Sequence, residues 1–284
     1  MLISLISYHG LQEAFKINYK KEIMKQLMQT AVKAAYEAGN KILEVYARDF
    51  AVETKEDKSP LTEADKAAHL VIKAFLADTD IPMLSEEGKK MEYEVRKEWS
   101  RFWLVDPLDG TKEFIKKNGE FTVNIALVEN GIPKGGVVYV PVKGTMYYGY
   151  EGAGSFAFTV DAAQDVVAQM EGAHTLPSAN TNVYSVVASR SHNSPETESF
   201  IEDKKKLHGE VSIVSSGSSI KLCLVAEGKA NVYPRLAPTM EWDTAAGHAV
   251  AKYAGCKVYQ FETGNELAYN KENLLNPWFV VERN

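Results

Sequence analysis

The feature that most constrains this chain is a strongly apolar run that leads directly into an acidic turn. Residues 102–105 read Phe-Trp-Leu-Val, and Asp106-Pro-Leu-Asp-Gly-Thr111 follows. A short apolar run of this kind predicts a buried strand. The residue before a proline is biased towards extended backbone, so we expect the strand to end at Asp106. Gly110 permits the positive φ of a chain reversal, so a helix is expected to start near Thr111.

This turn brings several oxygen atoms together within four residues. The Asp106 carboxylate, the Leu108 carbonyl and the Asp109 carboxylate can converge, and hard divalent cations prefer such oxygens. Asp, Pro and Gly are also the commonest residues of ordinary turns, so a surface turn is the alternative for this motif taken alone. Two other acidic segments favour the metal-site interpretation.

The further acidic residues each have an ordinary structural alternative. Glu86 and Glu87 follow a short predicted strand, and their alternative is a solvated turn. Asp243 lies in the first turn of the last long helix, where it would complement the helix dipole if it were not a metal ligand. Asp65 lies three residues after Thr62 at a helix start. It is either the partner in a capping box or a carboxylate near a metal-bound water.

Two segments suggest binding of an anionic ligand. The loop 215–219 reads Ser-Ser-Gly-Ser-Ser and runs into a helix whose first turn carries Lys221. Backbone donors at such a helix start can hold a phosphate, and a serine N-cap after a flexible loop is the alternative. His192 follows a strand end beside Arg190; it is either a surface imidazole or a group that faces an anionic or purine-bearing ligand.

Composition narrows the class of protein. At 284 residues the chain can form two units with their own cores or one large layered α/β body. A formal net charge of −6, without a basic stripe, argues against a nucleic-acid surface. Cys223 and Cys256 lack a metal-type spacing and are expected to be reduced core thiols of a cytoplasmic protein. No run reaches the roughly 18 apolar residues of a membrane span.

The order of predicted elements gives a layered α/β (α+β) fold in two halves. An N-terminal α+β half, 24–160, carries amphipathic helices over 23–47 and 62–76, a hairpin or loop over 48–60 and then an antiparallel sheet. Residues 160–182 lead to a C-terminal α/β half, 183–284. Its expected strands cover 183–188, 210–214, 230–233 and 257–260, and its expected helices cover 195–206, 218–228 and 243–253. Residues 1–22 are interpreted as an N-terminal extension, with Met24 as an alternative start.

Three acidic motifs follow one another along the chain: Glu86-Glu87, Asp106–Thr111 and Trp242–Gly247. In this order they resemble the three motifs of the lithium-sensitive, magnesium-dependent phosphatases of the inositol monophosphatase superfamily. The resemblance covers the chain from about residue 24 and implies an αβαβα sandwich, with metal binding in the N-terminal half and substrate binding in the C-terminal half. It also implies two or more magnesium ions. The implied ligands are Glu86, Asp106, the Leu108 carbonyl, Asp109 and Asp243.

Within that superfamily, residues 112–114, 189–192, 217–230 and 233–239 are similar to the bacterial 3′(2′),5′-bisphosphate nucleotidases of the CysQ type. This resemblance implies hydrolysis of adenosine 3′,5′-bisphosphate to AMP and phosphate, in connection with sulfate assimilation. It implies catalytic roles for Asp65, Thr111 and Glu86, the first two in positioning or deprotonating the attacking water. The implied substrate contacts are Gly110, Thr111, Ser189, His192, Ser218, Lys221 and Asp243.

Two alternatives remain at this point. One is an inositol monophosphatase or another sugar-phosphate phosphatase, such as a fructose bisphosphatase, on the same scaffold. The other is a non-catalytic module that senses nucleotides or cations. The resemblance further implies inhibition by micromolar to millimolar lithium. The expected location is the cytoplasm, and contact with the inner-membrane surface is left open.

Overall fold

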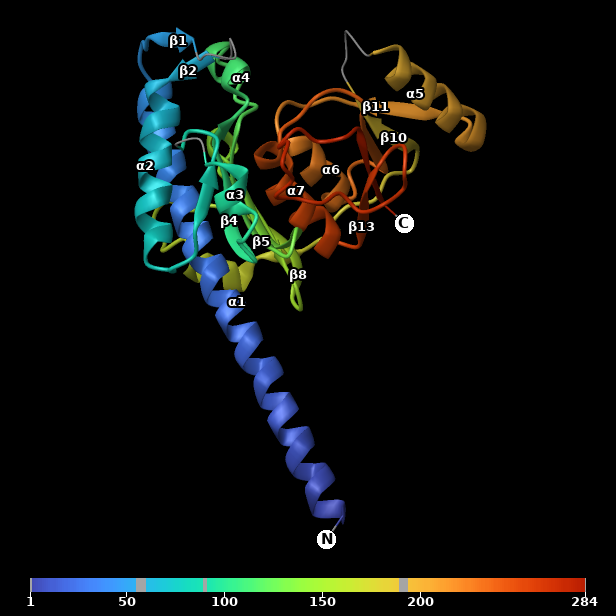
Figure 1. Cartoon of the computed structure of the whole chain (residues 1–284). Coiled ribbons are helices and arrows are strands. Elements are labelled where there is room, and N and C mark those ends of the chain that lie inside the picture. The colour runs from blue at the N-terminus through green and yellow to red at the C-terminus, as the bar shows by residue number, and fades with distance from the viewer. Residues whose placement is uncertain (1, 55–59, 89–90, 189–193, 284) are drawn as a thin grey trace.

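The chain folds into five alternating layers of helices and sheets (Figure 1). The computed structural model describes the backbone of residues 2–54, 60–88, 91–188 and 194–283, and the side chains from residue 18 except those of residues 54, 60 and 61. The layers pack against one another through three apolar cores. The predicted αβαβα sandwich is confirmed.

The first layer consists of two packed helices, α1 (Leu2–Tyr46) and α2 (Glu63–Ala77). Their apolar side chains recur at helical spacing and lie in one core with the outer face of the first sheet. A small hairpin of β1 (Val52–Thr54) and β2 (Pro60–Thr62) joins them. The N-terminal part of α1 projects away from the layers (Figure 1).

The second layer is a seven-stranded sheet in which β3 and β4 are parallel and all later neighbours are antiparallel. Tight turns join most of the antiparallel neighbours. In spatial order the strands are β3 (Met83–Ser85), β4 (Arg101–Asp109), β5 (Thr122–Glu129), β6 (Ile132–Val140), β7 (Thr145–Tyr150), β8 (Gly154–Thr159) and β9 (His174–Thr175). The short helices around it are α3 (Tyr93–Arg96), α4 (Thr111–Ile115), η1 (Pro141–Lys143) and η2 (Ala168–Gly172).

Strand β4 does not end at Asp106, and that prediction was wrong. The strand continues through Pro107 to Asp109, with a register shift against β5 between Asp106 and Asp109. Proline cannot donate a ladder hydrogen bond, and an irregularity in the register accommodates it inside a strand. The strand therefore carries both aspartates to its carboxyl end before Gly110, at φ 94°, turns the chain into α4.

The third layer lies between the two sheets and consists of α6 (Ile220–Glu227) and α7 (Glu241–Tyr253). The fourth is a five-stranded mixed sheet, and α5 (Pro195–His208) covers its outer face. The sheet order is β11 (Val211–Val214), β10 (Tyr184–Val187), β12 (Val232–Arg235), β14 (Phe279–Arg283) and β13 (Cys256–Gln260). Strand β14 was not predicted, although it lies antiparallel between β12 and β13.

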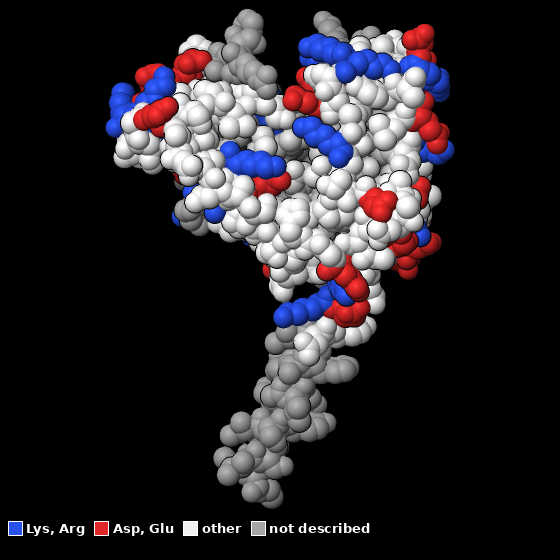
Figure 2. Space-filling view, turned by 180° about the vertical axis from the view of Figure 1, so that it is seen from behind, with Lys and Arg blue, Asp and Glu red and all other residues white. Residues whose placement is uncertain are grey.

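Three other expectations concern the molecule as a whole. The boundaries of the two halves stay a prediction, since β9 falls within the predicted connecting stretch. Within the described parts of the chain, no helix has both the length and the apolar character that a membrane crossing needs. On the face shown in Figure 2, the basic side chains of described residues are interspersed with acidic ones and form no continuous stripe.

Candidate active site

Three aspartates from two distant segments meet where β4 ends and α7 begins. Asp106 and Asp109 come from the end of β4, and Asp243 comes from the first turn of α7. One carboxylate oxygen of each lies within 4.8 Å of the others. Glu86 adjoins this group, because its backbone N–H donates to the Val105 carbonyl and its side chain bonds to Asp106. Of the carboxylates that the sequence singled out, Glu86, Asp106, Asp109 and Asp243 are therefore brought together.

Burial and mutual repulsion perturb these acids strongly. Burial, followed by the charges of Glu86, Asp109 and Asp243, holds the pKa of Asp106 well above its usual range. Burial and the charge of Asp109 raise the pKa of Asp243 to about 8. Carboxylates so close together need protons or a cation to offset their repulsion. An all-oxygen set of this charge fits a hard divalent cation.

Asp65 uses its two carboxylate oxygens for different purposes. Oδ2 accepts hydrogen bonds from the backbone N–H and the hydroxyl of Thr62, at 2.8 and 2.6 Å, which forms the capping box of α2. Oδ1 accepts a hydrogen bond from the Thr111 hydroxyl at 3.3 Å, and that hydroxyl also lies 3.3 Å from the Leu108 carbonyl. The capping interpretation is therefore confirmed, and Asp65 also bonds to Thr111; its place beside a metal-bound water stays a prediction.

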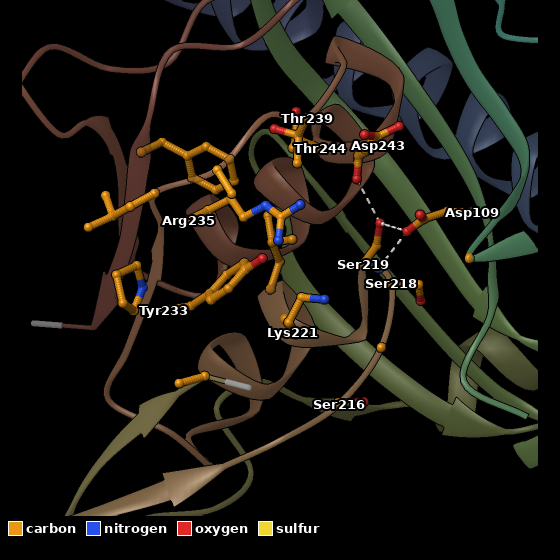
Figure 3. A pocket seen from close by; sticks show the side chains of 18 of the residues that line it. Asp109, Ser216, Ser218, Ser219, Lys221, Tyr233, Arg235, Thr239, Asp243 and Thr244 are labelled. Atoms are coloured by element: carbon orange, nitrogen blue, oxygen red, sulfur yellow. Dashed lines mark hydrogen bonds between the residues drawn. The ribbon is translucent and has the colours of Figure 1, made fainter. Parts of the chain in front are cut away.

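The start of α6 contacts the same acidic group. The backbone N–H and the hydroxyl of Ser219 lie 2.6 and 2.8 Å from Asp109 Oδ2, and the hydroxyl lies 2.7 Å from the Asp243 carbonyl oxygen (Figure 3). Ser218 approaches Gly110 so closely that a Cβ at Gly110 would lie 3.2 Å from the Ser218 Cβ. Ser219 occupies the N-cap position of α6 without a capping bond from its side chain. The sequence analysis gave Ser219 no individual role.

A cavity of about 430 Å³ opens beside the aspartates. Lys221 and Arg235 point their cationic groups into it, towards the side on which Asp109 and Ser219 lie (Figure 3). The remaining wall includes the aromatic or apolar side chains of Tyr233, Leu236 and Phe279. The cavity therefore combines an acidic end, two cationic side chains and an apolar wall.

Arg235 is a pocket residue that the sequence analysis did not single out. Its Nη2 donates to the Pro238 carbonyl at 3.0 Å, while its buried Nε has no hydrogen-bond partner among the described residues. The positive charge of Arg235 lowers the pKa of Asp243 and so opposes part of the rise that burial and Asp109 cause. The available signal was its position in the segment Tyr233-Pro-Arg235, which was noted only as part of the resemblance. Ser189 and His192 lie outside the described residues.

Comparisons with known proteins agree with this geometry. Residues 23–279 match the Inositol monophosphatase family. The chain is 46% identical over 260 residues to the 3′(2′),5′-bisphosphate nucleotidase CysQ of Salmonella typhimurium, covering 90% of this chain and 99% of that protein, and equally similar to CysQ of Escherichia coli K12.

Solved structures give the same result. The crystal structure of CysQ from Bacteroides thetaiotaomicron, described as a bacterial member of the inositol monophosphatase family, has 54% identity and a TM-score of 0.83. The match covers 91% of this chain and 97% of that one. The SuhB protein of Bartonella henselae shares the fold at 22% identity, with a TM-score of 0.67. From sequence and fold together, this chain belongs to the inositol monophosphatase family.

Proposed function

We propose that this protein is a magnesium-dependent phosphomonoesterase that hydrolyses adenosine 3′,5′-bisphosphate to AMP and phosphate. The relatives with 46% identity over nearly their whole length are 3′(2′),5′-bisphosphate nucleotidases. The observation that carries the proposal is the pairing, in one cavity, of an acidic group with two cationic side chains, Lys221 and Arg235.

A substrate with two phosphates explains this pairing. One phosphate would lie at the acidic end, where bound cations offset the charge of the aspartates. The second would face Lys221 and Arg235, since charge-assisted hydrogen bonds are the strong ones. A monophosphate without a second anionic group would leave these cations uncompensated. Tyr233, Leu236 and Phe279 supply the apolar surface that a purine base needs, and the volume lies within the range of about 300–1,000 Å³ usual for small-molecule sites.

The residues that would hold two or more magnesium ions are Glu86, Asp106, Asp109 and Asp243, together with the Leu108 carbonyl. When bound, such cations lower the pKa of a water and offset negative charge on the phosphate and the leaving oxygen. The raised pKa values of Asp106 and Asp243 support this assignment, because burial and then the neighbouring carboxylates disfavour their ionised forms, and a bound cation would favour them.

Thr111 and Asp65 would handle the proton of the attacking water. The Thr111 hydroxyl can orient the water while Asp65 Oδ1 accepts the hydroxyl's proton. Asp65 Oδ2 is held by Thr62, so the carboxylate keeps one fixed direction. The water oxygen forms the new bond to phosphorus and the bond between phosphorus and the ribose 3′-oxygen breaks. The leaving oxygen takes up a proton from solvent water, and the proton that Asp65 received returns to solvent. This route corresponds to general-base assistance from positioned side chains.

The proposal extends to partners and location. A small phosphorylated nucleotide is the proposed substrate, and a nucleic-acid polymer is not expected for a chain of net charge −6. Cys223 and Cys256 are buried and free, which supports a reducing, cytoplasmic location.

Phosphate release from a panel of metabolites tests the proposal. With magnesium, adenosine 3′,5′-bisphosphate should be hydrolysed with a much higher kcat/KM than inositol 1-phosphate or fructose 1,6-bisphosphate, and lithium should inhibit. A preference for either sugar phosphate would favour the other activities of this family. Binding of the nucleotide without turnover would favour a sensing module.

A further inference from the structure

We propose that Ser219 and Asn124 form a positioning pair that holds Asp109 and the first turn of α7 at the separation that cation binding requires. The inference rests on the proposed function for its meaning in catalysis. Its test measures cation binding directly. Neither residue is among the proposed metal ligands or substrate contacts.

Ser219 links the two segments that carry the aspartates. Its hydroxyl lies 2.8 Å from Asp109 Oδ2 and 2.7 Å from the Asp243 backbone carbonyl, so one side chain reaches both β4 and α7 (Figure 3). Its backbone N–H binds the same Asp109 oxygen at 2.6 Å. The Asp109 carboxylate is thus fixed from the start of α6. Ser219 is only 1% exposed, so water does not compete for these bonds.

Asn124 fixes the direction of the Ser219 hydroxyl. It lies on β5 directly opposite Asp106 in the β4–β5 ladder, and it is fully buried. Its Nδ2 donates to Ser219 Oγ at 2.8 Å. A hydroxyl that accepts this bond still has its own proton to donate, and the acceptors within reach are Asp109 Oδ2 and the Asp243 carbonyl. A chain of hydrogen bonds therefore runs from β5 through Ser219 to both aspartate-bearing segments.

The carbonyl oxygen of the Asn124 side chain favours a positioning role over a role in packing alone. Asn124 Oδ1 is buried and has no partner among the described residues. A buried acceptor without a partner lowers the stability of a fold, so a leucine of similar shape would be the more stable choice for packing alone. Retaining asparagine is explained if its N–H must orient Ser219.

Removing the pair should weaken cation binding before it weakens folding. A carboxylate oxygen of Asp109 and one of Asp243 lie within 4.8 Å of each other, so the two side chains repel each other when no cation lies between them. Among the described residues, no hydrogen-bonding side chain other than that of Ser219 joins the Asp109 carboxylate to the Asp243 backbone. Residues that orient metal ligands typically change metal affinity by about 10–100-fold when they are replaced.

The experiment compares Ser219→Ala, Asn124→Leu, the double variant and the control Ser185→Ala with the wild type. Ser185 is an equally buried serine whose hydroxyl bonds to Ser212 and Val183 in the other sheet, away from the site. Isothermal titration calorimetry gives the dissociation constant for magnesium alone. Thermal unfolding in EDTA gives the stability without cation. Both measurements use the full-length protein.

We expect a magnesium dissociation constant raised by roughly 10-fold or more in Ser219→Ala and Asn124→Leu, and unchanged in Ser185→Ala. The double variant should resemble Ser219→Ala, because both residues act through one hydroxyl. Asn124→Leu should keep or exceed the wild-type melting temperature in EDTA.

Wild-type magnesium affinity in the folded variants would overturn the proposal. If Ser219→Ala does not fold, Asn124→Leu alone decides. A wild-type protein that binds magnesium but does not cleave adenosine 3′,5′-bisphosphate would refute the proposed function while leaving this test intact.

Discussion

Asp65 accepts a hydrogen bond from the Thr111 hydroxyl at 3.3 Å through one carboxylate oxygen, while its other oxygen caps the helix on which it lies. The cap keeps the carboxylate in one orientation, because Thr62 binds Oδ2 through both its backbone N–H and its hydroxyl. A helix-capping group and the hydrogen-bond acceptor of Thr111 are thus combined in one residue.

Replacing Thr111 by valine should slow the reaction without affecting the fold. Valine keeps the shape but removes the hydroxyl that, in the proposed mechanism, connects the attacking water to Asp65. We expect kcat to fall by roughly 10²-fold or more, since positioned proton transfer contributes about 10²–10⁴-fold. Steady-state kinetics at saturating magnesium measure this. Thr145→Val is the control, because among the described residues that hydroxyl bonds to the Lys143 carbonyl alone; equal losses in both variants would contradict the assignment.

Asp109→Asn should abolish turnover while the protein stays folded. The change removes one negative charge from the acidic group. The amide oxygen of asparagine can still accept the hydrogen bond that the Ser219 N–H donates to Asp109. We expect a loss of about 10³-fold or more in kcat, because stabilisation of developing charge is usually the largest catalytic contribution. Magnesium should no longer raise the melting temperature. Asp203→Asn, on the exposed side of α5, should behave as wild type.

Lys221→Met should reduce the preference for bisphosphates. Its amine points into the cavity, so its loss would remove the proposed charge-assisted contact with the second phosphate, worth about 1.5–3 kcal/mol, or roughly 10–100-fold in kcat/KM. A substrate that lacks the second phosphate should be little affected. Lys257→Met, at an exposed position on β13, is the matched control. A uniform loss for both substrate types would place Lys221 elsewhere in the reaction.

Stability without magnesium should fall as the pH rises. Asp243 has a pKa of about 8 in the folded protein against an ordinary value of 3.8, and the pKa of Asp106 is raised as well. Between these values the folded state binds more protons than the unfolded state, so these groups lower the free energy of unfolding as pH increases.

Magnesium offsets the same charge, so the gain in melting temperature on adding it should be larger at about pH 8.5 than at about pH 6. Thermal unfolding in EDTA and in magnesium at both pH values measures this difference. A gain that does not change with pH would show that the acids are not coupled to cation binding. Asp109→Asn should weaken the pH dependence, because the charge of Asp109 contributes to the raised pKa of both acids.

Gly136→Ala should destabilise the contact between β6 and α7. A Cβ at Gly136 would lie 2.5 Å from the Ala246 carbonyl oxygen and 2.8 Å from the Ala249 Cβ, so α7 would have to shift. Overpacking of this kind costs about 1–3 kcal/mol, measurable by urea unfolding. Gly172→Ala meets no atom within 4 Å and should be nearly neutral. Because α7 carries Asp243, magnesium affinity should also fall in Gly136→Ala alone.

Local sequence was sufficient for most of the main elements and for the acidic group, but not for the end of β4 or for strands β8 and β14. Alternating and helical apolar patterns marked α2, β10 and α7 to within a few residues. The end of β4 was misplaced because proline only biases its neighbour, while pairing with β5 carries the strand on to Asp109. Strand β14 is short and follows a long irregular segment, and its pairing with β12 and β13 is a property of the assembled sheet.

The contacts of Ser219 could not be predicted, because they join residues far apart in the sequence. Its partners Asp109 and Asn124 lie 110 and 95 positions away. Within the run 215–219 it looks equivalent to its neighbouring serines, and only the fold selects it. Arg235 was not singled out for a similar reason, since one arginine at the end of a strand carries no distinctive local pattern.

The cavity draws its acidic end and its opposite wall from separate stretches of the polypeptide. Asp109 belongs to the seven-stranded sheet, whereas Lys221, Tyr233 and Arg235 belong to α6 and β12. Sequence changes around β12 are therefore expected to alter which phosphorylated compound binds while leaving the acidic group unchanged. Such modularity offers protein engineers a route to new phosphatase specificities by redesigning one wall of the cavity.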